Sequence, residues 1–407
     1  MANNKEKRLL ADMHIHSEGS FDGTYSIDKI IGIANKNNVH TIAITDHNNF
    51  SAIKNFFVEN NLPLLGCYHN INGINLIPGV EVTCVMPQIL NNVGYKTKFH
   101  LLVYGARLDN YSPLAKLLEL KHNNDELVDY GLLKLISSQN NFKVTTSSIK
   151  EYVIQKRGEQ SGFGRFGAKS VIEFLKYNNI SLAKSERELL KILKNAPTME
   201  RLELNMEDVI KLAHASGGIC ILAHPKKNLE RTNQKSQAIK QMLKWGIDGF
   251  EILDNSMNQE TFEVIMKECK SFKPKSKLLF TGGSDMHFES QELTVGKTYN
   301  YPITLASQQS FIDEIIRLDK ARQIGILSVR NHPKPAEEIV ETILTKYNQT
   351  EKDLEDKYFS AQIKFNKADN SDENVEENEY VKPEDYDTLE DYISAVLNFE
   401  ATHEKTK

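Results

Sequence analysis

The chain has 407 residues, of which 40% are hydrophobic and 26% charged, with 21 glycines and 11 prolines. These values are typical of a soluble globular protein and exclude a fibrous or wholly disordered chain. The formal net charge is -5, but residues 369–391 contain eleven acidic residues and one basic residue, so the rest of the chain is near +5. This mildly basic body suits an anionic substrate, although the excess is too small to predict tight binding to long nucleic acid.

The sequence has no run of about 20 apolar residues, which excludes a membrane-spanning helix. Its first residues also lack the apolar core of a signal peptide. We therefore expect a cytoplasmic protein without a membrane partner. The four cysteines, Cys67, Cys84, Cys220 and Cys269, have no CxxC spacing. They are predicted to be reduced and packed among apolar side chains.

Short β-rich runs alternate with helical patterns over the first three hundred residues, which is typical of parallel βα units. The helical patterns include residues 26–36, 51–60, 206–215, 236–245 and 259–269, the first of them opened by a capping Ser26. The predicted strands are 9–16, 40–47, 75–83, 98–104, 218–224, 249–253 and 277–282. Seven such units favour a closed or nearly closed α/β barrel over an open sheet.

Two further parts of the chain depart from this alternation. We expect the barrel over residues 1–110 and 206–305, with a helical insertion over the active site at 111–205. Residues 306–366 are expected to form a helical C-terminal extension, with helices near 308–321 and 336–347. Residues 367–407 are expected to form an acidic, largely disordered tail with a candidate terminal helix at 386–399. We hypothesise that this tail engages a protein partner or competes with polyanions.

Histidines and carboxylates gather at the ends of the predicted strands. Because the carboxyl ends of the strands in a parallel barrel meet at one rim, these residues are expected to form a single cluster. His14 and His16 are alternate residues of one strand, so both imidazoles are expected to point the same way. The set comprises His14, His16, His47, His100, His224, His287, Asp12, Asp22, Asp46, Glu81 and Asp285.

This mixture of donors predicts transition-metal ligands. Imidazoles with carboxylates suit Mn, Fe or Zn, whereas an all-oxygen Mg or Ca site does not need so many histidines. The candidates exceed what one tetrahedral ion takes, so we predict two or three divalent metal ions as cofactors. Closely spaced ions activate a hydroxide and stabilise both oxygens of an in-line displacement at phosphorus. The residues alone therefore favour metal-dependent hydrolysis of phosphate esters.

Six motifs carry a family resemblance. DMHIHSEGSFDGTYS, AITDHNN, PGVEVT, FHLL, ILAHP and GGSDMH occur in this order. Together they closely resemble the PHP (polymerase and histidinol phosphatase) superfamily over about residues 8–300. The resemblance implies a distorted (β/α)7 TIM-like barrel with a trinuclear metal site.

The resemblance also implies a set of ligands by position. One ion would be held by His14, His16, Glu81 and Asp285, with Glu81 bridging to a second ion held by His100 and His224. A third would be held by Asp22, His47 and His287, where Asp22 stands in place of a histidine of some members. Asp12 and Asp46 are expected to orient the imidazoles, with Asp46 also a candidate for direct metal contact. The candidate catalytic residues are Glu81, Asp285, His224 and Arg165.

The predicted insertion narrows the resemblance to one branch. Residues 164–168 and the segment HASGGICILAHPKKN resemble the nucleotide phosphatase and 5'-3' exonuclease branch. Arg165 would suit bidentate phosphate binding, and Lys226 and Lys227 are further candidates; the alternative is that all three are solvated. The segment 254–256 lacks the basic and histidine residues often seen in that branch. The resemblance therefore specifies the type of reaction more closely than it specifies the substrate.

We therefore predict a metal-dependent hydrolase acting on phosphate esters of nucleotides or short oligonucleotides through a metal-activated hydroxide. A rim histidine or a metal-bound water would protonate the leaving oxygen. One alternative is a histidinol-phosphate phosphatase, which shares the metal ligands but resembles the insertion and the extension less well. The non-enzyme alternative is a PHP-like scaffold or binding module that acts through its C-terminal tail. The complete set of candidate ligands argues against this last possibility.

Overall fold

A computed structural model of the chain describes residues 10–20, 22–92, 94–140, 174–177, 201–272, 278–289, 294–297, 303–326 and 335–369. The chain divides into two compact units. The first comprises residues 1–119, 157–161 and 203–347, and the second comprises residues 120–156, 162–202 and 348–407. The predicted cluster of histidines and carboxylates belongs to the first unit.

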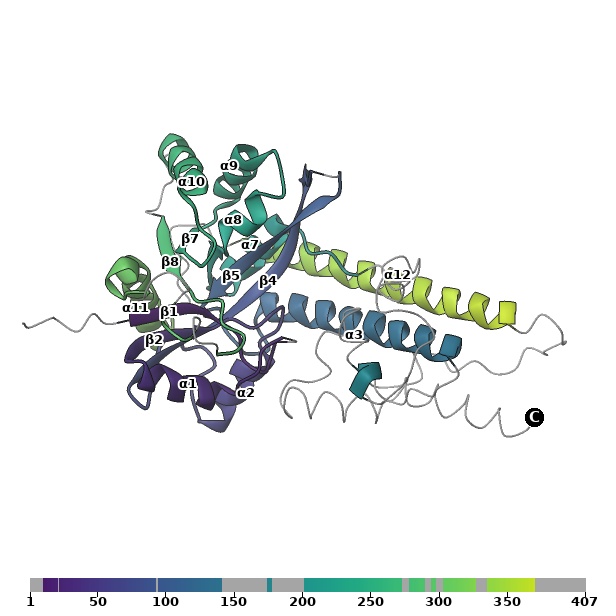
Figure 1. The fold of residues 1–407 in the computed structure, drawn as a ribbon, viewed down its shortest axis with the longest axis horizontal. Helices are drawn as coiled ribbons and strands as arrows, with labels where there is room; N and C mark the ends of the chain where they lie inside the picture. The colour runs from purple at the N-terminus through teal and green to yellow at the C-terminus, as the bar shows by residue number, and fades with distance from the viewer. Residues whose placement is uncertain are drawn as a thin grey trace, which may run out of the picture. The chain divides into compact units, whose positions relative to one another are not determined.

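The first unit is built on an eight-stranded mixed sheet with the order β1-β2-β4-β5-β6-β7-β8, in which β3 pairs with β4 (Figure 1). Each of the seven predicted strands has a counterpart, and the three-residue β3 is an addition. The strands are β1 (Leu10–Ile15), β2 (Val39–Ile44), β3 (His69–Ile71), β4 (Ile74–Leu90), β5 (Lys96–Tyr104), β6 (Ile219–Leu222), β7 (Gly249–Leu253) and β8 (Leu279–Gly282).

The helices of the first unit follow the strands as the periodicity predicts. Ser26 caps α1 by accepting a hydrogen bond from the Lys29 amide, and Asn205 caps α7 in the same way through the Glu207 amide. The helices are α1 (Ile27–Lys36), α2 (Ser51–Glu59), α7 (Met206–Ala215), α8 (Pro225–Leu229), α9 (Lys235–Trp245), α10 (Gln259–Phe272), the 3-10 turn η2 (Ala306–Gln308) and α11 (Gln309–Gln323).

Two longer helices lie in the regions predicted as insertion and extension. α3 (Pro113–Asn140) begins the former, and α12 (Glu337–Asp369) runs well past the predicted end of its helix at residue 347. Tyr347 on α12 accepts a hydrogen bond from the Asn205 amide at 2.7 Å and thereby fixes the start of this helix to the first unit. Residues 370–407, with the predicted acidic tail and terminal helix, lie outside the described residues.

The direction of β5 differs from the prediction of parallel units. β5 pairs antiparallel with both β4 and β6, whereas β1, β2 and β4 are mutually parallel, as are β6, β7 and β8. β4 continues to Leu90 and is followed by β5 from Lys96, so the connection is a hairpin and not a helical crossover. A parallel pair needs a crossover of a dozen or more residues, and this short turn excludes one.

An apolar cluster fills the interior of the first unit between the sheet and α11. Met13, Ile77, Leu102 and Ile221 meet there, and α11 packs against them. Tyr104 crosses this interior and donates a hydrogen bond from its hydroxyl to the Met13 carbonyl at 2.7 Å. Burial of these side chains provides the main stabilisation of the scaffold that carries the opposite rim.

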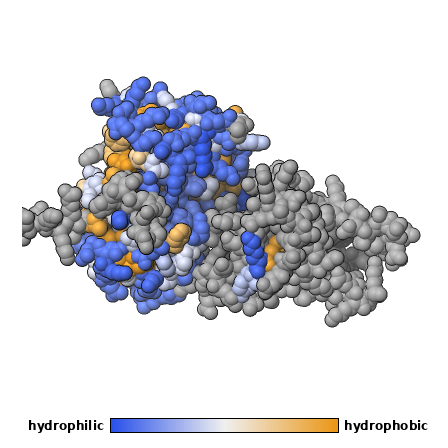
Figure 2. Space-filling model, viewed as in Figure 1, coloured by the Kyte–Doolittle hydropathy of each residue, from blue (hydrophilic) through white to orange (hydrophobic). Residues whose placement is uncertain are grey.

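The two edge strands of the path approach each other at the rim. Ile15 and Met286 form a single parallel bridge, and the Asp285 amide donates to the His14 carbonyl at 2.9 Å. A mixed α/β fold with a central sheet is therefore confirmed, whereas closure into a complete barrel stays a prediction. The first unit presents a largely hydrophilic surface in the view of Figure 2. None of the described helices is long and apolar enough to span a membrane.

Candidate metal centre

Four donor atoms at the rim lie close together, and five of their six separations are 3.2–3.5 Å. His14 Nε2 is 3.2 Å from His16 Nε2, and both nitrogens lie 3.4 Å from Asp285 Oδ1. Glu81 Oε2 is 3.5 Å from His14 Nε2 and 3.4 Å from His16 Nε2. A four-coordinate ion with metal–ligand distances of about 2.0–2.1 Å has ligand–ligand distances of about 3.3–3.4 Å. The spacing of these four donors therefore fits one tetrahedral transition-metal ion.

Glu81 connects this tetrahedron to a second group of imidazoles. Its Oε1 lies 2.8 Å from His100 Nδ1 and 2.8 Å from His224 Nε2, while Oε2 belongs to the first group. The carboxylate is fully buried in the middle of β4, not at a strand end. Its two oxygens thus face different sets of nitrogens, which is the arrangement of a carboxylate that bridges two ions.

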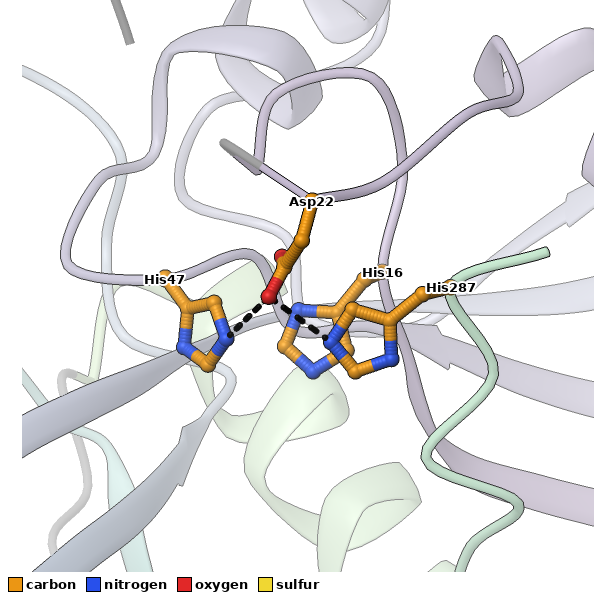
Figure 3. A group of neighbouring side chains, drawn as sticks. All are labelled: His16, Asp22, His47 and His287. Carbon is orange, nitrogen blue, oxygen red and sulfur yellow. Dashed lines mark ion pairs between the residues drawn. The ribbon is translucent and has the colours of Figure 1, made fainter. Parts of the chain in front are cut away.

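A third group surrounds Asp22 (Figure 3). Asp22 Oδ2 lies 3.6 Å from His47 Nε2 and 3.4 Å from His287 Nε2. The ring of His16 stacks on that of His287 with centroids 4.1 Å apart, so His16 reaches this group as well as the first. The structure therefore brings together all nine residues that the resemblance implied as ligands.

Several of these imidazoles direct Nε2 towards the other candidate ligands and contact a neighbouring oxygen through Nδ1. His14 Nδ1 lies 3.2 Å from Glu251 Oε1, and His16 Nδ1 lies 2.9 Å from Ser20 Oγ. His287 Nδ1 lies 2.8 Å from the Asp285 carbonyl. Such contacts fix the tautomer and direct the Nε2 lone pair towards a metal ion.

Glu251 is the residue that sequence reasoning missed. It is fully buried in β7, contacts His14 and accepts a hydrogen bond from the His224 amide at 2.7 Å. It thereby joins a residue of the first group to one of the second. A carboxylate inside the otherwise apolar strand 249–253 was the available signal, because a buried charge needs a partner.

Asp12 and Asp46, which were expected to orient the imidazoles, accept hydrogen bonds from backbone and hydroxyl groups. Asp12 accepts hydrogen bonds from the amides of Ser284 at 2.9 Å and Gly296 at 2.8 Å. Asp46 accepts from the Ser17 hydroxyl at 2.6 Å and from the Ser20 hydroxyl at 3.0 Å. Asp46 therefore reaches His16 through Ser20, which was not predicted.

The backbone at the rim is strained where two candidate ligands sit. His224 has a φ of 25° and Asp285 a φ of 55°, in a region that non-glycine residues adopt only at a cost. Gly283 lies so close to His14 that a Cβ at this position would collide with the histidine side chain. Strain of this kind is concentrated at functional sites, and here it sets the directions of the ligands.

The charges of the cluster suit cations. Burial alone would raise the pKa of Glu81, but the imidazoles of His100, His14 and His47 hold it well below its ordinary value. Burial would also raise the pKa of Asp285, and His14 holds that pKa well below its usual range. For His47, burial opposes protonation, yet Glu81 and Asp22 raise its pKa to about 10. The ionised carboxylates thus raise the pKa of His14, His47 and His287, whereas burial lowers the pKa of His100, and divalent ions would replace the protons of the raised group.

The predicted phosphate-binding residues differ in their surroundings. Lys227 Nζ lies 2.7 Å from Asp285 Oδ2, at the edge of the first group, whereas Lys226 Nζ lies 3.8 Å from Glu230 and away from Asp285. Both lysines belong to α8. Arg165 lies outside the described residues.

The donor set passes a direct test of its fit to metal ions. Glu81 Oε2 is a buried carboxylate oxygen with no aligned hydrogen bond among the described residues, although His47 Nδ1 lies 2.9 Å from it and the Nε2 atoms of His14 and His16 lie 3.5 and 3.4 Å from it. A buried carboxylate oxygen that faces several imidazole nitrogens without an aligned donor suits a cation. The histidines and carboxylates fit Mn, Fe or Zn, and the number of ions is not fixed by the donors alone.

Comparison with known proteins agrees with this geometry. A profile of the PHP domain matches residues 12–252, which is more than half of the chain. The chain belongs to the PHP domain family. Membership of this family supports a hydrolase that acts on phosphate esters in general. The phosphoesterases of the family depend on metal ions, which agrees with the clusters of histidines and carboxylates in this structure.

Two relatives of this PHP domain protein are informative. A 5'-3' exoribonuclease of Haemophilus influenzae is 23% identical over 290 residues, covering 70% of this chain and 93% of its own. A crystal structure described as a metal-dependent phosphoesterase of Bifidobacterium adolescentis superposes with a TM-score of 0.51 at 18% identity, covering 75% of this chain and 95% of its own. The second likeness concerns the fold alone.

Proposed function

We propose that the protein is a metal-dependent phosphoesterase that hydrolyses nucleotides or the 5' ends of short oligonucleotides at a site of two or three ions. The close spacing of the donor atoms of His14, His16, Glu81 and Asp285, with five separations of 3.2–3.5 Å, is the observation that carries this proposal. We also propose that the sheet closes as the distorted seven-stranded barrel of the family, with the rim residues facing one mouth.

The roles of the residues follow from their positions. His14, His16, Glu81 and Asp285 would hold one ion, His100, His224 and Glu81 a second, and Asp22, His47 and His287 a third. Bound divalent ions would make water a nucleophile at neutral pH and neutralise charge on the phosphoryl oxygens. The water oxygen forms the new bond to phosphorus, the bond from phosphorus to the ester oxygen breaks, and that oxygen takes up a proton.

Lys227 would supply positive charge from the protein itself. Its Nζ lies at the edge of the first group beside Asp285, and its side chain is 45% exposed, so a phosphoryl oxygen can reach it. Lys227 therefore has a stronger structural case for phosphate binding than Lys226. Arg165 stays a candidate for the same role on the grounds of the resemblance alone.

The nucleotide class of the substrate rests on the resemblance to the nucleotide phosphatase and exonuclease branch. The relative named as a 5'-3' exoribonuclease supports the same class of substrate, and this chain matches 93% of that relative's length. A histidinol-phosphate phosphatase would use the same ligands, so the cluster does not separate the two substrates. The substrates themselves must be compared.

A substrate panel with the manganese-loaded full-length protein tests this proposal. We expect release of phosphate or mononucleotide from a 3',5'-bisphosphonucleotide or from 5'-phosphorylated oligonucleotides, with little turnover of histidinol phosphate. Preference for histidinol phosphate would overturn the substrate class and leave the chemistry intact. A protein that retains less than about one metal per chain after Mn or Fe supplementation, and that hydrolyses none of these esters, would instead be a scaffold.

A further inference from the structure

The strand β5 carries a pattern that the metal centre does not use. Alternate residues of a strand share one face, so Tyr104, Leu102, His100, Lys98 and Lys96 all lie on the same face of β5. Tyr104 and Leu102 belong to the apolar interior, and His100 contacts Glu81. The same face therefore passes from core to metal centre to two lysines.

The alternation is confirmed by burial on the other face of β5. Thr97, Phe99 and Leu101 are at most 1% exposed, whereas the Lys96 side chain is 52% exposed. The ladder to β4 is regular here, with His100 opposite Thr83 and Lys98 opposite Val85. At about 3.4 Å per residue, Lys98 and Lys96 lie about 7 Å and about 14 Å beyond His100 along the strand.

The tip of the hairpin adds an exposed aromatic ring. Tyr95 precedes Lys96 and is 73% exposed. The backbone of Tyr95 is held in the turn, because its amide donates to Asn91 Oδ1 at 2.9 Å and its carbonyl accepts from the Asn91 amide at 2.6 Å. Basic side chains along a strand together with an exposed aromatic ring are the features with which proteins bind single-stranded nucleic acid.

We propose that Lys98, Lys96 and Tyr95 form a binding track for the nucleotides that follow the scissile phosphate of a single-stranded oligonucleotide. This inference rests on the proposed function and deepens it, because it makes an oligonucleotide, and not a mononucleotide, the substrate that the site binds best. Lys98 and Lys96 bind successive phosphates, and Tyr95 stacks on a base. Glu203 pairs with Lys96 at 2.6 Å, but exposed pairs of this kind are weak and yield to a polyanion.

The test compares a 5'-phosphorylated hexanucleotide with a 3',5'-bisphosphonucleotide in the manganese-loaded protein. In the Lys96→Gln/Lys98→Gln double variant, the ratio of kcat/KM for the hexanucleotide to that for the bisphosphonucleotide falls about tenfold, mostly through the KM of the hexanucleotide. The dependence of hexanucleotide binding on log salt becomes shallower by about 1.4, or about 0.7 for each lysine. Tyr95→Ala lowers the same ratio without changing the salt dependence.

Two variants serve as matched controls. Lys240→Gln removes a lysine that is 60% exposed on α9, and Tyr111→Ala removes a tyrosine that is 77% exposed after the other end of β5. Both are expected to keep the wild-type ratio and salt dependence. If the double variant still hydrolyses both substrates with an unchanged kcat/KM ratio and an unchanged salt dependence, the proposed track is wrong. Equilibrium binding of a labelled hexanucleotide compares the wild type and the double variant without turnover. If the proposed function fails, no ester is hydrolysed but the variant still binds the hexanucleotide more weakly; if the track fails, the two proteins bind it equally.

Discussion

His14 and His214 are both buried histidines beside a carboxylate, yet their surroundings are opposite. His14, at the end of β1, contacts Glu251 through Nδ1 at 3.2 Å and points Nε2 at three other candidate ligands. His214, at the end of α7, contacts Asp248 through Nε2 at 3.0 Å. Asp248 also accepts a hydrogen bond from the Cys220 amide at 2.9 Å, so the group of His214, Cys220 and Asp248 joins α7 to β6 and to the residue that precedes β7.

The difference shows what turns a buried histidine into a ligand. His214, Cys220 and Asp248 also lie close enough together to hold an ion. One oxygen of Asp248, however, accepts two hydrogen bonds, whereas Glu81 Oε2 at the rim makes no aligned hydrogen bond among the described residues and faces several imidazole nitrogens, of which His47 Nδ1 is 2.9 Å away. We expect donors that converge without aligned hydrogen bonds to hold a cation, and donors that are fully hydrogen-bonded to stabilise the fold.

Replacing Glu81 by alanine gives the largest expected effect. The variant removes both oxygens that face the two groups of imidazoles, so we expect loss of bound metal together with activity, with kcat/KM falling at least about 1000-fold. Metal content by atomic emission and turnover of the preferred ester are measured together. Glu207→Gln on the surface of α7 is the control. A folded Glu81→Ala protein with normal turnover would refute the bridging role.

The variant Asp248→Asn tests whether the group around His214 stabilises the fold without binding metal. His214 keeps a neighbour of the same size but loses the negative charge, and we expect the free energy of unfolding to fall by about 1–3 kcal/mol. Metal content and kcat should equal those of the wild type at a temperature where the variant is folded. Urea unfolding and metal analysis check both statements. If the variant lost an equivalent of metal instead, the group around His214 would be a metal site.

Glu251→Gln sharpens the comparison within the rim. Glutamine preserves the volume but weakens the contact that fixes His14 and the hydrogen bond from the His224 amide. We expect metal affinity to fall about 10–100-fold, as for other residues that orient metal-binding histidines. Excess Mn should restore activity, which distinguishes a positioning role from misfolding. Activity that stays low at saturating Mn would mean that Glu251 takes part in the reaction itself.

The sequence allowed the cluster to be predicted because short apolar runs mark the strands and polar residues follow them. His14, His47, His224 and Asp285 were assigned to the cluster in this way. His100 lies in the cluster for a different reason from the one predicted, because it is in the middle of an antiparallel strand and not at the end of a parallel one. Periodicity gives strands but not their direction, and only the missing helix between residues 83 and 98 signalled a hairpin.

Other features of the site depend on tertiary contacts that no local pattern contains. Glu251 is far from His14 in sequence and meets it only because β7 lies near β1 across the rim. Ser20 connects Asp46 to His16 through a loop whose path the sequence does not reveal. The difference between Lys226 and Lys227 likewise follows from the turn of α8 that places one of them beside Asp285.

Replacement of Cys220 gives the smallest expected effect and tests the group of His214, Cys220 and Asp248 in another way. Burial raises the pKa of its thiol well above the ordinary value. The unfolded chain therefore binds fewer protons than the folded one once the pH exceeds about 8.5, and stability falls as the pH rises above that value. We expect Cys220→Ala to make this alkaline loss smaller by about 1 kcal/mol at pH 9.5, as measured by urea unfolding at pH 7 and pH 9.5.

The same variant also separates packing from ligation. A thiol held in its neutral form by burial is a poor metal ligand, because thiolate is the form that binds metal. Cys220→Ala is therefore expected to retain the wild-type metal content, and the native wild-type thiol should resist iodoacetamide at neutral pH until the protein unfolds. Loss of metal from this variant would make the two buried histidine groups alike, and the contrast between satisfied and unsatisfied donors would fail.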